Sequence, residues 1–149
     1  MLSDRIDAGL MERAPNLKVI AGMGVGFNHI DLDAATARGI LVSNTPGANT
    51  DAAADLAFGL MSAAARRIIE ADHRTRAGEF RHWAPLLFLG RMVSGKTLGL
   101  VGMGKIGQAM VRRAQGFSMR VVYYDPRRLE PAQEKALGVE YAELATLLG

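Results

Sequence analysis

Three glycines with the spacing G-x-G-x-x-G stand about two-thirds of the way along the chain, at Gly102, Gly104 and Gly107. The first permits a tight turn, the second removes a Cβ that would block a close ligand, and the third lets a helix pack against a strand. A helix that starts here points unpaired N–H groups and the positive end of its dipole at the ligand. The spacing therefore predicts a turn that binds phosphate.

The segments around this turn are those that a dinucleotide site requires. Residues 97–101 are short and apolar like a buried parallel strand, and apolar residues then recur at helical spacing from Ile106 to Phe117. Residues 120–124 read as a second strand, and Asp125 follows it at the expected distance of roughly 20 residues from the glycines. This order is the dinucleotide-binding fingerprint. A glycine-rich turn that binds nothing is the less favoured alternative.

The acid at the end of the second strand bears on which cofactor binds. Asp125 can accept hydrogen bonds from an adenosine ribose and repel a 2′-phosphate, which favours NAD over NADP. Arg127 and Arg128 leave NADP open as the alternative, because an arginine just past the acid can meet a 2′-phosphate. The favoured interpretation of both arginines is that they are solvated basic side chains.

Bulk composition excludes several classes of function. The chain is 49% hydrophobic and 22% charged, which is ordinary for a globular protein that builds a core. Its net charge of +3 comes from scattered basic residues without interleaved aromatics, so we expect no nucleic-acid partner. The chain has no cysteine, and its three histidines lack metal-ligand spacing, so we expect no metal site. No apolar run reaches the ~20 residues of a membrane span, and no secretion signal is visible, which predicts a cytoplasmic protein without a membrane partner.

The first third of the chain reads as a small βαβ unit. We expect strands at 17–21 and 40–43 and a helix at 31–38 that Asp31 caps and Gly39 ends. A short helix that carries Ile6 precedes them, with Ser3 or Asp4 as its cap.

The segments that flank the fingerprint are less regular. Thr50 is predicted to cap a helix that continues to about Glu70. That helix has almost no polar face, so we expect it to be buried between domains or subunits. After Asp125 we expect a polar loop or short helix at 126–136, at most a tiny strand at 139–141, and a helix from 143. We expect no further parallel strand after that helix and an open sheet edge beside 120–124, so that the chain reads as the middle of a larger protein.

Several ordered segments together resemble the D-isomer-specific 2-hydroxyacid dehydrogenases, whose members include glyoxylate and hydroxypyruvate reductases and phosphoglycerate dehydrogenases. The matching segments are APNLKVI at 14–20, GVGFNHID at 24–31, RGI at 38–40 with NTPG at 44–47, ADLAF at 54–58, SGKTLG at 94–99 and the fingerprint through Asp125.

The resemblance implies an α/β fold in two parts. Residues 1–48 would be an incomplete flavodoxin-like substrate domain. Residues 49–149 would be an interdomain helix joined to the first half of a Rossmann NAD-binding domain. The amides around Val25 and Gly26 would hold a substrate carboxylate, and Thr50 would lie near the nicotinamide. Lys105 and Ile106 would present amides to the pyrophosphate, beside the three glycines, and Asp125 would hold the ribose.

The family's catalytic histidine, carboxylate and arginine have no counterpart in this chain, so we assign no catalytic residue. His29 and Asp31 superficially form a histidine–carboxylate pair. A helix-capping Asp31 with a solvated or packing His29 is the favoured interpretation. His73 is expected on the surface, and His82 is expected to pack at an interface.

The resemblance implies an NAD-dependent oxidoreductase that transfers hydride between the nicotinamide and a small 2-oxo or 2-hydroxy acid. It also implies a homodimer. The chain as printed would be an inactive portion of that enzyme. The alternative from another class is a non-catalytic NAD-sensing interaction protein, like the corepressors that share this architecture.

Overall fold

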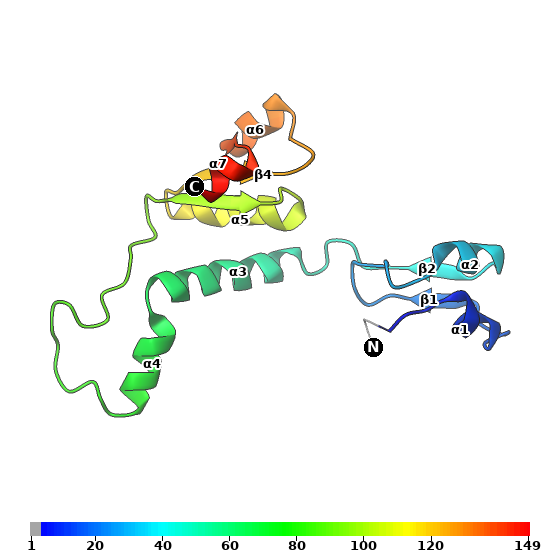
Figure 1. Ribbon diagram of the computed structural model, residues 1–149, viewed down its shortest axis with the longest axis horizontal. Coiled ribbons are helices and arrows are strands. Elements are labelled where there is room, and N and C mark those ends of the chain that lie inside the picture. The colour runs from blue at the N-terminus through cyan, green and yellow to red at the C-terminus, as the bar shows by residue number, and fades with distance from the viewer. Residues whose placement is uncertain (1–3) are drawn as a thin grey trace. The chain divides into compact units, whose positions relative to one another are not determined.

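A computed structural model describes residues 4–149 (Figure 1). The chain divides into two compact units between Ala48 and Asn49. Each unit has its own hydrophobic core and its own parallel sheet, and each is described by itself.

The first unit is the predicted βαβ arrangement. Its elements are α1 (Ala8–Glu12), β1 (Val19–Ala21), α2 (Leu32–Ala37) and β2 (Leu41–Ser43). The two strands pair in parallel, with Ile20 opposite Val42. The core consists of side chains that are at most 9% exposed: Met11, Ile20, Ile30, Ala35 and Ile40.

The helix caps of the first unit confirm one prediction and correct another. Asp31 Oδ1 accepts the N–H of Ala34 at 2.9 Å, so Asp31 caps α2 as predicted. The cap of α1 is Asp7, whose Oδ1 accepts from Leu10 N at 2.9 Å, and the prediction of Asp4 was wrong. Ser3 lies outside the described residues. Ile6 precedes the helix and forms a parallel bridge with Ile30. The helix begins after Asp7 because the carboxylate of that residue meets a free amide of the first turn.

The second unit begins with two helices, α3 (Thr50–Ala65) and α4 (Ile68–Arg76). The predicted single helix to Glu70 was wrong, because Arg67 adopts a left-handed conformation at φ 55° and breaks it. The carbonyl of Ala65 then accepts the N–H of Arg91 at 2.7 Å. Thr50 is the first helical residue and not the cap, which is Asn49.

A three-stranded parallel sheet forms the rest of the second unit. Its elements are β3 (Thr97–Val101), α5 (Lys105–Gly116), β4 (Arg120–Tyr124), α6 (Pro131–Leu137), β5 (Val139–Tyr141) and α7 (Leu144–Leu148). The strand order is β3-β4-β5. Residues 79–96 between α4 and β3 contain no helix or strand.

The tiny strand expected at 139–141 is present as β5, and the expectation of an open sheet edge beside β4 was wrong. β5 pairs with β4 in parallel, with Val121 opposite Val139 and Tyr123 opposite Tyr141. A three-residue strand gives too short a hydrophobic pattern to show which strand it pairs with, and in the folded unit Val139 is buried to 6% exposure.

Helices cover both faces of this sheet (Figure 1). α5 lies on one face, where its buried residues Ala109, Val111 and Ala114 join a core with Val121. α7 lies on the other face, where Leu147 contacts the position at which Gly99 would carry a Cβ. This packing fixes the end of β3 against the start of α5.

Helix α3 packs along α5 through a narrower stripe than its composition predicts. Only Ala54 and Phe58 are buried, and the Phe58 ring lies 4.9 Å from that of Phe117. Leu56 and Leu60 remain 64% and 60% exposed. Burial on several sides is therefore not found within the described unit, which leaves an apolar face on α3.

Candidate dinucleotide-binding site

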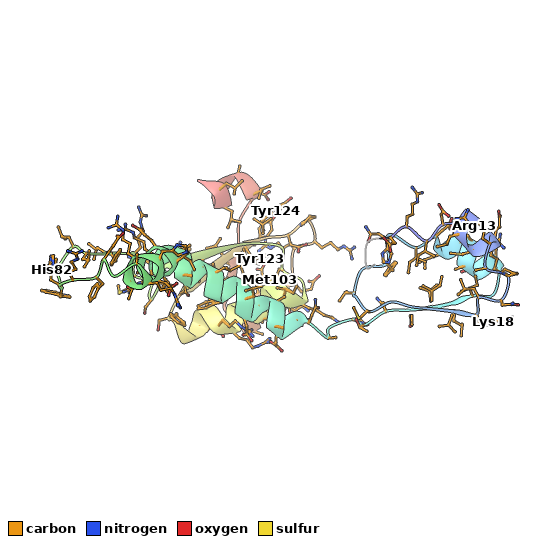
Figure 2. All side chains as sticks on the ribbon, turned by 90° about the horizontal axis from the view of Figure 1, so that it is seen from below. Arg13, Lys18, His82, Met103, Tyr123 and Tyr124 are labelled. Atoms are coloured by element: carbon orange, nitrogen blue, oxygen red, sulfur yellow. The ribbon has the colours of Figure 1, made fainter. Side chains whose placement is uncertain are left out.

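The glycine turn between β3 and α5 has the conformation that its spacing predicts. Gly102 has φ 102°, which only glycine adopts without strain, and its N–H donates to the carbonyl of Tyr124 at 2.7 Å. A Cβ on Gly107 would lie 2.3 Å from the carbonyl oxygen of Gly102. Both positions therefore require glycine for the turn to close. The side chains of Met103 and Tyr123 lie in the core beside this turn (Figure 2).

The start of α5 is open toward a ligand. Gly104 is its N-cap and has no side chain that could accept a hydrogen bond. The N–H groups of the first turn, which includes Lys105 and Ile106, are therefore available as donors. A Cβ on Gly104 would meet no heavy atom within 4 Å. This glycine is therefore not needed for packing, and the space beside it suits a ligand.

A cavity of about 460 Å³ lies over this turn. Its volume is within the roughly 300–1,000 Å³ of small-molecule sites. The lining comes from β3, the turn, α5 and α3: Ala57, Leu100, Val101, Gly102, Gly104, Lys105, Ile106, Gly107 and Met110. The structure thus brings together all the predicted pyrophosphate-binding residues.

Asp125 lies across the turn from these amides. Its Oδ2 accepts the N–H of Met103 at 2.8 Å, and its Oδ1 accepts the N–H of Arg127 at 2.9 Å. The Met103 amide first, and then the Arg127 amide, lower the pKa of Asp125 below its ordinary value. The carboxylate is therefore ionised at neutral pH, and each oxygen keeps a lone pair for a ribose hydroxyl.

The two arginines after Asp125 differ in their surroundings. Arg127 is exposed, and its positive charge helps to lower the pKa of Asp125. Arg128 donates to both carboxylate oxygens of Glu134, at 2.8 and 3.0 Å. Arg128 is solvated as interpreted, with a side chain 56% exposed, but its ion pair with Glu134 was not predicted.

The predicted substrate-binding residues lie in the first unit, in the loop after β1. Val25 and Gly26 are both exposed. Asn44 Nδ2 donates to the carbonyl of Val25 at 2.9 Å, and the N–H of Thr45 donates to Gly24 at 3.1 Å. These bonds tie the loop to the segment that follows β2, so it lies at the carboxyl ends of both strands, where open α/β sheets bind ligands.

Thr50 begins α3 and therefore belongs to the second unit, with the residues of the glycine turn. Its side chain is half-buried. Val25 and Gly26 belong to the first unit.

None of the histidines has the surroundings of a catalytic acid. The carbonyl of His29 accepts the N–H of Ile6 at 2.8 Å, and the neighbouring Asp31 is occupied as a helix cap. His73 is exposed on α4 as predicted. His82 is exposed in the segment after α4, far from Met103 in Figure 2, and its predicted packing at an interface is not seen within the described chain. Across residues 4–149 no three acidic or histidine side chains cluster as metal ligands would.

Sequence reasoning missed two contributors to the site. Ala57 lines the cavity from α3, more than 40 positions before the glycine turn. Gln108 Nε2 donates to the carbonyl of Met103 at 3.2 Å and braces the turn from within α5. Neither residue has a local signal, because each acts through a contact that the folded chain creates.

Comparison with known proteins agrees with this architecture. Residues 1–144 match the family model described as the D-isomer specific 2-hydroxyacid dehydrogenase catalytic domain. A glyoxylate reductase of Thermococcus litoralis is 51% identical over 99% of this chain and 46% of its own length. The chain thus spans about half the length of the curated relatives it matches.

Several solved structures are similar to this protein over 99% of its chain. The TT0316 protein from Thermus thermophilus has a TM-score of 0.87 and 48% identity, over 45% of that protein. A D-lactate dehydrogenase from Aquifex aeolicus, complexed with NAD and lactic acid, has a TM-score of 0.82 and 31% identity over 43% of its length. The predicted α/β fold class, with flavodoxin-like and Rossmann parts, is confirmed. This chain belongs to the D-isomer specific 2-hydroxyacid dehydrogenase family.

Proposed function

We propose that this chain is part of an NAD-dependent oxidoreductase that passes hydride between nicotinamide and a small 2-oxo or 2-hydroxy acid, with glyoxylate as the first substrate to test. The observation that carries the proposal is the ionised Asp125 carboxylate across the glycine turn from the open start of α5. The identity to glyoxylate reductases supports the substrate class. When bound, the cofactor supplies the hydride, and the protein supplies binding and orientation.

The two units divide this work. Residues 1–48 would bind substrate, and residues 49–149 would bind the cofactor. The amides of Lys105 and Ile106, exposed at the start of α5, would hold the pyrophosphate, and the Asp125 carboxylate would accept from the adenosine ribose. Thr50 would lie near the nicotinamide, and the amides of Val25 and Gly26 would hold the substrate carboxylate.

The first test replaces Asp125. Asp125→Asn in the natural gene product that carries this sequence is expected to weaken NADH binding about tenfold, because a charged acceptor of the ribose hydroxyls is lost. The variant should lose little NADPH affinity, because the charge that repels the 2′-phosphate is also gone. Titration of nucleotide fluorescence measures both dissociation constants. Unchanged NADH affinity in the variant would remove Asp125 from the site.

A second test concerns association. We propose a homodimer that covers the apolar face of α3, where Leu56 and Leu60 are 64% and 60% exposed in this chain. Leu60→Asp is expected to convert the dimer to a monomer in sedimentation velocity runs, and Leu60→Met should leave it a dimer. Wild-type protein that sediments as a monomer at micromolar concentration would contradict this proposal.

A further inference from the structure

A cluster of four side chains, Tyr123, Arg128, Glu134 and Tyr141, anchors the loop that follows Asp125. We call it the loop anchor. Tyr123 is fully buried on β4. Its hydroxyl donates to Glu134 Oε1 at 2.8 Å and accepts the N–H of Leu129 at 2.9 Å. One buried phenol thus joins β4, the loop and α6.

Arg128 is held in the loop anchor from two sides. Its Nε and a terminal guanidinium nitrogen reach the two Glu134 oxygens at 2.8 and 3.0 Å, which is bidentate pairing. Its Cζ lies 4.8 Å from the centre of the Tyr141 ring, within cation–π range. The Glu134 side chain is only 12% exposed, whereas that of Arg128 is 56% exposed, so it is the bidentate geometry and the Tyr141 ring that hold the guanidinium.

The charges of the loop anchor persist at neutral pH. Hydrogen bonds from Arg128 and then Tyr123 lower the pKa of Glu134, so it stays ionised. Burial raises the pKa of the Tyr123 hydroxyl, so it stays protonated and remains a donor. Arg128 is therefore occupied under the conditions in which a cofactor binds.

Arg127, one residue earlier, is placed differently. Its amide donates to Asp125 Oδ1, and, although both arginines are exposed residues, Arg127 does not share the pairing of Arg128 with Glu134. To bind despite repulsion by the Asp125 carboxylate, a 2′-phosphate would need a guanidinium that is free for bidentate contact. Of the two arginines, only Arg127 meets that condition.

We propose that Glu134 is a positioning residue for cofactor selectivity: it holds Arg128 against Tyr141, so that Arg128 cannot offset the repulsion between Asp125 and a 2′-phosphate. This inference rests on the proposed NAD-binding function. It leaves Arg127 as the one arginine after the selective acid that is placed to meet a 2′-phosphate.

Glu134→Gln tests the proposal, because glutamine keeps an acceptor for the Tyr123 hydroxyl and removes the charge that holds Arg128. The NADPH dissociation constant of the gene product is expected to fall about tenfold, as a charge-assisted contact is gained, with NADH binding within about twofold of wild type. Adding Arg128→Gln to this variant should reverse the gain. Glu140→Gln is the matched control, since it makes the same change in net charge outside the loop anchor. Glu140 lies on β5, is exposed and pairs with Arg120 of β4.

A second pair of variants keeps the proposal testable if Glu134→Gln folds poorly in a thermal melt. Arg127→Gln should weaken NADPH binding about fivefold through the loss of one charged contact, and Arg128→Gln should leave it within about twofold. Equal losses for the two variants would overturn the inference.

The outcomes separate the inference from the function beneath it. Wild-type protein that binds neither nucleotide overturns the proposed function and the inference together. Wild-type protein that prefers NADH, with a Glu134→Gln variant whose NADPH affinity is unchanged, overturns the inference alone. A variant that weakens both nucleotides equally also overturns it, because Glu134 would then serve only the fold.

Discussion

Gly107→Ala is expected to reduce NADH affinity about a hundredfold, the size of effect that a displacement of about 1 Å can produce. The added Cβ would lie 2.3 Å from the carbonyl oxygen of Gly102, and a backbone atom cannot swing aside as a side chain can. The turn must therefore open, which moves the amides of α5 and the Met103 amide that donates to Asp125. Overpacking of this kind also costs about 1–3 kcal/mol of stability. Fluorescence titration and thermal melts measure the two effects.

Two other glycines of the same segment act as controls for this variant. Gly116→Ala, at the end of α5, places its Cβ in open space and should leave binding unchanged. Gly104→Ala also meets nothing within 4 Å, so its melting temperature should match wild type. Its NADH affinity should nevertheless fall, because the Cβ occupies the side where a pyrophosphate would approach. If Gly107→Ala binds NADH as wild type does, the close turn is not part of the site.

The second large effect is on turnover. We expect the polypeptide of residues 1–149, purified alone, to oxidise NADH with glyoxylate at least about a hundredfold more slowly than the gene product that carries it. Reduction of a carbonyl needs a proton donor at the developing alkoxide, and general acid catalysis contributes roughly 10²–10⁴-fold. His73 and His82 are exposed on or after α4, and the carboxylate nearest to His29 in sequence, Asp31, caps α2.

Spectrophotometric assay of NADH oxidation with glyoxylate and with hydroxypyruvate follows this turnover. Nucleotide titration of the same sample shows whether its cofactor unit is folded. A rate for residues 1–149 within tenfold of the gene product would overturn the expectation, and His29→Gln would then show whether that histidine supplies the proton.

The fingerprint segment was predictable because its signals are local. The apolar run at 97–101 is bounded by the turn glycines, and the run at 120–124 by Asp125, and both are strands over those residues. The helix between them shows a clear apolar stripe that packs on the sheet. Glycines and an acid at fixed spacing then place the candidate site without any long-range information.

Other features were not predictable because tertiary contacts decide them. A tiny strand at 139–141 was expected, but its parallel pairing with the edge of β4 was not. The break of α3 depends on Arg67 taking φ 55°, which its sequence does not favour. Composition also suggested an α3 buried on several sides, although only Ala54 and Phe58 are buried and Asp51 and Asp55 pair with Arg113 of α5.

The candidate site shows the same division. Gly102, Gly107 and Asp125 were found from spacing, and the geometry explains each of them. The role of Glu134 escaped detection because its partners Tyr123 and Arg128 lie in different elements and meet only when α6 folds back.

No helix among residues 4–149 has both the length and the apolar character required to cross a bilayer.

Titration of the wild-type gene product with NADH and with NADPH, at one ionic strength, tests the central claim most directly. The Asp125 carboxylate across the glycine turn predicts saturable NADH binding, with NADPH bound at least about tenfold more weakly because of the charge repulsion at the ribose. Equal or tighter binding of NADPH, or no binding of either nucleotide, would contradict the account.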